Sequence, residues 1–339
     1  MSEDDRYETY EEVPDGYNLV DAPPGELDRY GIPQKPDAIA EPSLFEFWKK
    51  LVSRPFFAKR PTFRDIDPPN ERIIEPSRGG TLESSLNWSG ALVSPPWPKR
   101  MFFATARWIA PSVSRPSAQA LFTQDPDIPK SLVWVGLDGH RGRLPKISLP
   151  QIGTGHWLGG PHPLDDPPPH FAWWAWWRHP PPEKEREKVM WIHNLPIDAY
   201  HEVLAGLAVL PSEDVLFFIK SQSTGQFRSF LAKRHKLGDI EPLGSSVEWV
   251  VERPTEPTSG KFYPLVAYSP PVDFKDCLAV AADRPCGPGR RLMTLADNGR
   301  MIKMREAFGN PYRTFYVSRA RRDDSDGSIG ITCTFNEPT

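Results

Sequence analysis

Proline is the residue that most constrains what this chain can fold into. The sequence contains 40 prolines among 339 residues, whereas average usage is about 5%. Proline removes a backbone hydrogen-bond donor and breaks the interiors of helices and of central strands. We therefore expect short elements, many stiff loops and few long helices.

Short strand-like segments follow one another from about residue 84. Each is bounded by turns containing Pro or Gly, and a series of such segments is typical of a β-sandwich or barrel. The predicted strands are 86–93, 101–109, 131–137, 170–177, 189–193, 215–221, 246–251, 265–268 and 330–335. Residues 201–210 fit a strand and a short helix equally well. The sequence therefore predicts an all-β domain over residues 81–339.

Residues 1–80 form a polar, Pro-rich N-terminal arm with one predicted helix at 43–54. Ser43 and Glu46 match the S-x-x-E capping box, and Pro55 ends the segment. The apolar residues recur at helical spacing and form one stripe, namely Leu44, Phe47, Trp48, Leu51 and Val52. A helix this short is marginal alone and must dock on something. We interpret the arm as a candidate pro-segment, with docking of a partner protein as the alternative.

Charge and hydropathy exclude several classes of partner. The net charge is −3, which gives no attraction to nucleic acid or to an anionic membrane. No apolar run approaches the ~18 residues of a membrane span, and the acidic N-terminus lacks the pattern of a secretory signal. We expect a soluble chain without nucleic-acid or membrane partners. Its compartment and oligomeric state stay open.

No familiar metal or cofactor motif is complete. His201 and Glu202 begin the zinc motif H-E-x-x-H, but Ala205 stands where the second His should be. Residues 153–155 begin a dinucleotide motif whose last Gly is replaced by Leu158. The three cysteines supply no disulfide framework, although one bridge remains open. The scattered histidines are interpreted as loop residues, so no cofactor and no metal is predicted.

Four motifs, in order, carry a family resemblance. They are N-W-S-G-A at 87–91, W-V-G-L-D-G at 134–139 followed by L-P-Q-I-G at 149–153, A-W-W-A-W-W at 172–177, and V-E-W-V-V-E at 247–252. S-T-G-Q at 223–226 lies between the last two. Together they resemble the eqolisin family of glutamic peptidases, which is also called scytalidoglutamic peptidase-like. The resemblance covers about residues 84–335.

The resemblance implies a fold and a reaction. The fold would be an antiparallel, concanavalin-like sandwich of two sheets with a concave cleft. The reaction would be hydrolysis of peptide bonds in a polypeptide substrate at acidic pH. Matched motif to motif, the catalytic pair falls on Gln151 and Glu248. A carboxylate can act as general base toward water, and a neutral amide can stabilise the oxyanion.

Strand alternation places further residues around this pair. Glu248, Val250 and Glu252 share one face of their strand, which is turned either to the cleft or to the core. The predicted cleft residues are Trp134, Asp138, Trp173 and Trp177, and two tryptophans on the cleft side could grip an extended peptide or a sugar. Trp134 also suits the core. Asp138 is expected at the cleft edge, where it would tune the pKa of Glu248.

Departures from the family pattern leave an alternative function open. Ala175 stands where the family has a Glu, and Arg178 with His179 replaces Pro-Asp. Loss of an acidic neighbour is expected to change active-site pKa values or substrate preference. The family is known from secreted enzymes, whereas no signal peptide is visible here. The alternative is a non-catalytic module that binds carbohydrate or peptide in a Trp-lined cleft.

Overall fold

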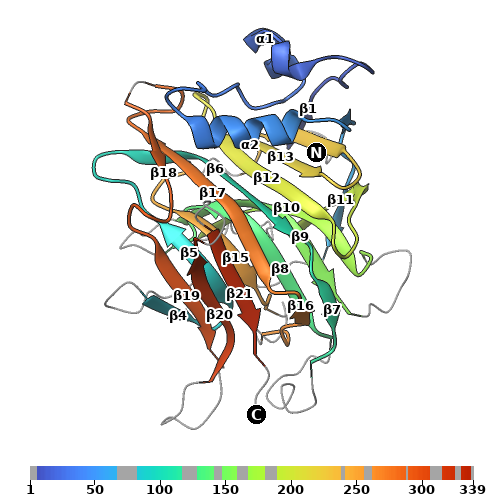
Figure 1. The fold of residues 1–339 in the computed structure, drawn as a ribbon, viewed down its shortest axis with the longest axis vertical. Helices are drawn as coiled ribbons and strands as arrows, with labels where there is room; N and C mark the ends of the chain where they lie inside the picture. The colour runs from blue at the N-terminus through green and yellow to red at the C-terminus, as the bar shows by residue number, and fades with distance from the viewer. Residues whose placement is uncertain are drawn as a thin grey trace.

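The computed structural model describes residues 6–66, 82–116, 128–140, 147–158, 167–179, 189–237, 241–255, 262–287, 289–305, 315–324 and 330–336. Two large layers of strands pack face to face, and the N-terminal arm lies over the outer side of one of them (Figure 1). We call the layer beneath the arm sheet A and the other layer sheet B. The predicted all-β sandwich is confirmed.

Sheet A begins at one edge with β18 and ends at β14. Its order is β18 (Arg291–Met293), β17 (Val272–Ala282), β6 (Arg100–Ile109), β12 (Glu202–Val209), β13 (Val215–Ser221) and β14 (Gln226–Ala232). Two short strands of the arm, β1 (Tyr7–Thr9) and β2 (Phe57–Ala58), pair with β14. The segment 201–210 that the sequence left undecided is therefore strand β12, which is paired on both sides.

Sheet B contains the strands that carry the family motifs. Its order is β3 (Phe63–Ile66), β11 (Val189–Pro196), β10 (His170–His179), β9 (Ile147–Trp157), β8 (Lys130–Leu137), β15 (Val247–Glu252), β5 (Trp88–Val93), β19 (Arg300–Arg305), β20 (Tyr316–Asp323) and β21 (Gly330–Phe335). β4 (Leu82–Ser85) runs parallel to β19. β7 (Ser112–Ser114) and β16 (Ala267–Ser269) form a separate small sheet.

Strand β17 links the two layers. Residues 272–274 pair with β21 in sheet B, whereas residues 275–282 pair with β6 in sheet A. The register shifts between Lys275 and Leu278, and such an irregularity bends a strand. The two layers are therefore continuous through one bent strand.

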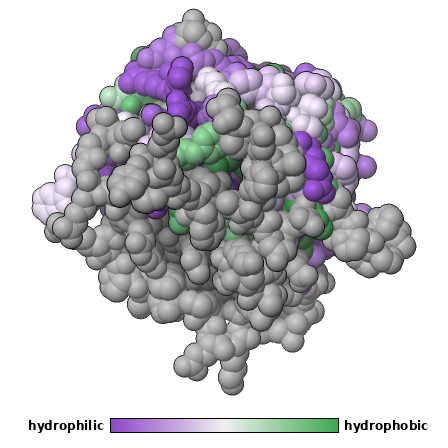
Figure 2. Space-filling view, turned by 90° about the horizontal axis from the view of Figure 1, so that it is seen from below, coloured by the Kyte–Doolittle hydropathy of each residue, from purple (hydrophilic) through white to green (hydrophobic). Residues whose placement is uncertain are grey.

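Three apolar clusters fill the spaces around the sheets. The largest lies between sheets A and B and includes Phe217 and Trp249. A second, which includes Trp173 and Val250, lies on the opposite face of sheet B. The third joins the arm to the outer face of sheet A. Seen from below, the described surface is mainly hydrophilic, and hydrophobic residues show only in small patches (Figure 2).

Helix α2 (Pro42–Val52) is the predicted arm helix, and its apolar stripe is buried as expected. The predicted capping box is wrong. The helix begins one residue earlier, with Glu41 at the N-cap, Pro42 in the first turn and no side-chain cap. Proline suits that first turn because the amide that it lacks would have no partner there. Ser43 thus lies inside the helix, and Glu46 pairs with Lys49 at 3.0 Å.

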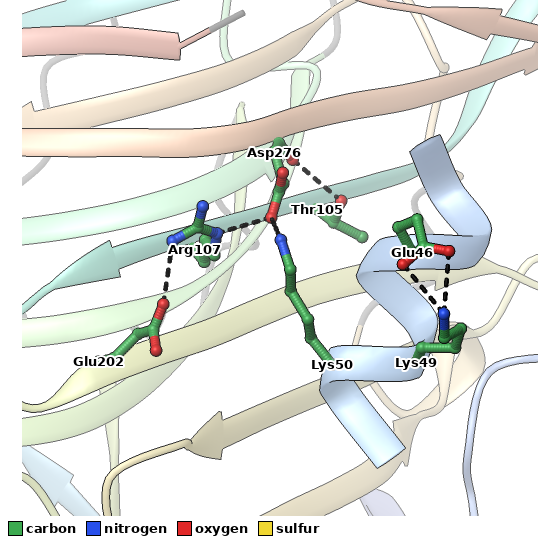
Figure 3. A network of polar contacts seen from close by, with 7 residues as sticks. All are labelled: Glu46, Lys49, Lys50, Thr105, Arg107, Glu202 and Asp276. Atoms are coloured by element: carbon green, nitrogen blue, oxygen red, sulfur yellow. Dashed lines mark hydrogen bonds and ion pairs between the residues drawn. The ribbon is translucent and has the colours of Figure 1, made fainter. Parts of the chain in front are cut away.

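A polar network ties α2 to sheet A (Figure 3). Lys50 contacts Asp276 of β17 at 3.0 Å. Asp276 also accepts a hydrogen bond of 2.7 Å from Arg107 of β6, and Arg107 reaches Glu202 of β12 at 3.0 Å. The buried Lys220 donates to the carbonyl oxygen of Ser53 at 2.7 Å, just after the helix. The helix and the residue after it are therefore bound directly to β17 and β13, and through Arg107 the network extends to β6 and β12.

The position of α2 bears on the two interpretations of the arm. Its apolar stripe packs on the outer face of sheet A, against residues such as Leu204 and Phe218. The stripe is therefore not available to a partner protein, and the helix does not cover sheet B. η2 (Leu19–Asp21) and α1 (Pro24–Arg29) join the same layer through Leu19 and Leu27. The predicted domain boundary at residue 80 lies outside the described residues.

Candidate active site

Gln151 and Glu248 lie in one row across three neighbouring strands. Gln151 of β9 is the register partner of Gly136 in β8, and Glu248 of β15 is the partner of Gly136 from the other side. Register partners point to the same face of a sheet. Two strand spacings put the Cα atoms of the pair about 10 Å apart. Sheet B therefore brings the two predicted residues to one place.

The face of sheet B that carries this row is the one turned away from sheet A. Ala175 is the partner of Gln151 on β10, and Leu92 is the partner of Glu248 on β5. Both belong to the apolar cluster on that face, whereas Trp249 belongs to the cluster between the sheets. Alternation thus sends Glu248 to the site and Trp249 to the core.

Gly136 places no side chain between the pair, and its surroundings leave no room for one. A Cβ atom at this position would lie 2.9 Å from the carbonyl oxygen of Pro150, 3.0 Å from Cζ3 of Trp134 and 3.1 Å from Cβ of Gln151. Any other residue would press against Gln151 and Trp134 beside the pair. The central Gly of the W-V-G motif is therefore a requirement of the site.

Glu248 is fully buried. The backbone N–H of His140 donates to its Oε1 at 3.1 Å. Burial, above all, raises the pKa of Glu248 to about 8, and the charge of Asp138 adds to the rise. The Ser246 hydroxyl and the N–H groups of Gly139 and His140 oppose it, although Oε2 has no hydrogen bond of normal geometry in the described part of the chain. The raised pKa thus favours the protonated form of the Glu248 carboxyl at neutral pH.

Asp138 lies at the end of β8 and is buried. Its carboxylate accepts hydrogen bonds from the backbone N–H groups of Leu243, Gly244 and Ser245 at 2.6, 3.0 and 2.5 Å, and from the Ser245 hydroxyl at 2.9 Å. Burial raises its pKa. Asp138 therefore fixes the segment that enters β15, next to Glu248.

The three predicted cleft tryptophans, Trp134, Trp173 and Trp177, lie on the face of sheet B that carries Gln151 and Glu248, and all three are buried. Trp174 and Trp176 point into the cluster between the sheets. Alternation along the A-W-W-A-W-W motif, read from the sequence, thus separates the two sets.

Glu252 is a further acidic residue on this face, to which the sequence analysis gave no role. It is buried, accepts from the Trp134 indole N–H at 2.8 Å and from the Asn87 amide at 3.3 Å, and burial raises its pKa to about 7. Its position in the V-E-W-V-V-E motif, on the same face as Glu248, was the sequence feature that could have pointed to it. The sequence could not show that Trp134 is its hydrogen-bond partner, because Trp134 lies over a hundred positions away.

Within the described ranges, no group of three or more His, Cys, Asp or Glu side chains is arranged to hold a metal ion. His156 is buried between the sheets, where burial lowers its pKa well below the usual value. All three cysteines are free. No helix in the described residues is long and apolar enough to cross a membrane.

The two-sheet antiparallel sandwich matches the fold of the eqolisin class of peptidases. The chain belongs to the Peptidase A4 family, whose family model matches residues 86–310. The resemblance to the eqolisin peptidases is thereby confirmed. No curated protein matches the chain closely enough to count as a relative.

One solved structure supports the fold, and two others are similar at lower TM-scores. A crystal structure of scytalido-glutamic peptidase with a transition state analog inhibitor has a TM-score of 0.52 at 17% identity, covering 74% of this chain and 98% of that one. SCP-B, an eqolisin in a complex with the tripeptide Ala-Ile-His, has a TM-score of 0.47 at 16% identity, with the same coverage. Aspergilloglutamic peptidase from Aspergillus niger has a TM-score of 0.41 at 14% identity, covering 61% of this chain and 99% of that one.

Proposed function

We propose that this member of a peptidase family is an endopeptidase that uses Glu248 as general base and Gln151 as oxyanion stabiliser. The observation that carries the proposal is the row Gln151–Gly136–Glu248, in which two polar side chains flank a glycine. The space above the glycine is where a water molecule and a peptide carbonyl could meet both side chains. The substrate would be a polypeptide.

The proposed reaction has two steps. Ionised Glu248 takes a proton from water while the water oxygen bonds to the carbonyl carbon, and the Gln151 amide donates to the oxyanion that forms. The tetrahedral intermediate then collapses, the C–N bond breaks, and Glu248 returns its proton to the leaving amine. The side chain of Gln151 carries no charge, so its donor capacity does not depend on pH in the working range.

The pKa of Glu248 bears directly on the working pH. A base must be ionised, and a carboxyl whose pKa is about 8 is protonated in acid. The resemblance implies activity at acidic pH. Such activity requires that water reaching the site lowers the pKa of Glu248. The buried state described above instead favours a rate that rises toward neutral pH.

The test is cleavage of an unfolded protein substrate between pH 3 and pH 9 in the presence of pepstatin. The full chain should cut the substrate, and Glu248→Gln should lower kcat by about 10²- to 10⁴-fold. Glu202→Gln is the matched control, because Glu202 lies in the Arg107 network of sheet A. Full activity of the Glu248 variant would refute the assignment.

The same experiment addresses the non-catalytic alternative. A binding module would hold peptide or glycan without cutting it at any pH. Retention of that binding in Glu248→Gln, with no cleavage by the unchanged chain, would support the alternative.

A further inference from the structure

The indole rings of Trp134 and Trp88 form an aromatic wall beside the proposed catalytic row, and Glu252 lies at one end of this wall. It lies four residues after Glu248 on the same face of β15, roughly 13 Å away along the strand. At that distance Glu252 cannot reach a water molecule held by Glu248. Its carboxylate is instead occupied by Trp134 at 2.8 Å and by Asn87 at 3.3 Å.

The Trp134 ring spans the distance between Glu252 and the catalytic row. Its Nε1 donates to Glu252, and Cζ3, at the opposite end of the indole, lies 3.0 Å from where a Cβ of Gly136 would stand. Gly136 is the residue between Gln151 and Glu248. The hydrogen bond at one end of the ring therefore fixes the wall of the gap at the other end.

A second indole, that of Trp88, lies beside the first. Trp88 is the register partner of Glu252 on β5, and its N–H favours the ionised form of Glu252, although it lies outside normal hydrogen-bond geometry. The far end of the ring lies 2.5 Å from the position of a Cβ at Gly139. The N–H of Gly139 supports the ionised Glu248. The Trp88 and Trp134 rings meet edge to face with centroids 4.9 Å apart.

We propose that Glu252 is a positioning residue for the reaction, because it holds Trp134, whose ring forms with the Trp88 ring packed against it the wall that shapes the space between Gln151 and Glu248. This inference rests on the function proposed above. Glu252 touches neither water nor substrate. Removing it frees the Trp134 ring to turn toward Gly136, and a displacement of about 1 Å in an active site can cost about 10²-fold in rate.

The primary test measures kcat and KM for Glu252→Gln, with Glu202→Gln as the control carboxylate. The glutamine keeps one acceptor for Trp134 but places an NH₂ group against the Asn87 amide or the Trp88 indole. We expect kcat to fall about 10- to 100-fold with KM within about twofold. The Trp134 indole N–H resonance, assigned by its loss in Trp134→Phe, should shift in the variant.

A double-variant cycle establishes that Glu252 acts through the indole. Trp134→Phe removes the N–H donor and keeps an aromatic ring, so it should lower kcat by a similar factor, and adding Glu252→Gln should lower it little further. If Glu252→Gln fails to fold, Trp134→Phe carries the test alone. Independent, multiplying effects would overturn the positioning role.

Failure of this inference is distinguishable from failure of the proposed function. If Glu248→Gln is inactive while Glu252→Gln and Trp134→Phe keep kcat unchanged, the positioning role is wrong and the catalytic assignment stands. If Glu248→Gln is fully active, the catalytic assignment is wrong.

Discussion

Gln151 and Glu248 are both register partners of Gly136, one from each side of strand β8. They are almost a hundred positions apart in the sequence, and one glycine separates them in space. Hydrogen bonding of three strands fixes this relationship before any side-chain contact is considered. The site therefore belongs to the most regular part of sheet B and not to a loop.

Gly136→Ala tests whether the gap matters. The added methyl would stand 2.9 to 3.1 Å from atoms of Pro150, Trp134 and Gln151, so it must displace the side chains that line the gap. We expect kcat to fall by at least about tenfold and stability to fall by about 1–3 kcal/mol. Activity assays and urea unfolding measure the two effects.

Gly25→Ala is the matched control for that substitution. A Cβ at Gly25 in α1 would meet nothing within 4 Å, so neither activity nor stability should fall. Unchanged kcat in Gly136→Ala would show that the space above Gly136 is not used in the reaction.

The raised pKa of Glu248 predicts how stability depends on pH. Between the ordinary glutamate pKa of 4.5 and the folded-state pKa of about 8, the folded chain binds a proton that the unfolded chain does not. Stability should therefore fall as pH rises through this window. Glu252, with a pKa of about 7, acts in the same direction.

Urea unfolding at pH 5 and pH 8 measures this effect. Glu248→Gln removes the titration, so its stability should fall less between the two pH values than that of the unchanged chain. An equal fall in both proteins would show that Glu248 does not titrate in this window.

Ala175→Glu restores the acidic neighbour that the family pattern carries. Ala175 is the register partner of Gln151. A carboxylate there, once ionised, would accept a hydrogen bond from the Gln151 amide and repel the oxyanion. We expect activity of this variant, relative to the unchanged chain, to fall as pH rises. A pH–rate profile measures it, and Ala175→Gln, equal in size and uncharged, should leave the profile in place. Identical profiles for the two variants would contradict the electrostatic explanation.

Trp48→Ala tests whether the arm is part of the folded sandwich. The Trp48 ring is buried against the arm and sheet A, and its N–H donates to the carbonyl oxygen of Pro33 at 2.8 Å. Deleting such a ring costs about 3–5 kcal/mol. We expect one cooperative unfolding transition that moves to lower urea concentration as a whole.

The control for Trp48→Ala is Glu46→Gln, which breaks an exposed pair with Lys49. A pair of this kind contributes about 0.3–0.5 kcal/mol. A sandwich transition that stays unchanged in Trp48→Ala would show that the arm folds separately, as a removable pro-segment could.

Local patterns in the sequence predicted the apolar stripe of α2 and most of the strands that carry the motifs, but not β9, which carries Gln151. Alternation with period two placed Glu248 and Trp249 on opposite faces of their strand but left open which of them faces the site. Register could not be predicted. The pairing of Gln151 and Glu248 with Gly136 depends on how β8, β9 and β15 align, which no local pattern encodes.

Other features depended on contacts between distant segments. The start of α2 was misjudged because Ser43 and Glu46 fit a capping box, whereas Pro42 already occupies the first turn. Strand β12 was ambiguous because its identity comes from pairing with β6 and β13. The role of Glu252 emerged only from Trp134 and Trp88, two rings brought to it by neighbouring strands.

The most direct test of the central claim is a double-variant cycle on kcat/KM with Gln151→Ala, Glu248→Gln and the two combined. Residues that act as one unit on one carbonyl are strongly non-additive. We predict that each single change lowers kcat/KM by at least about 10²-fold, and that the double change falls no more than about threefold below the worse single change. Losses that multiply, or a single variant with the activity of the unchanged chain, would contradict a shared site.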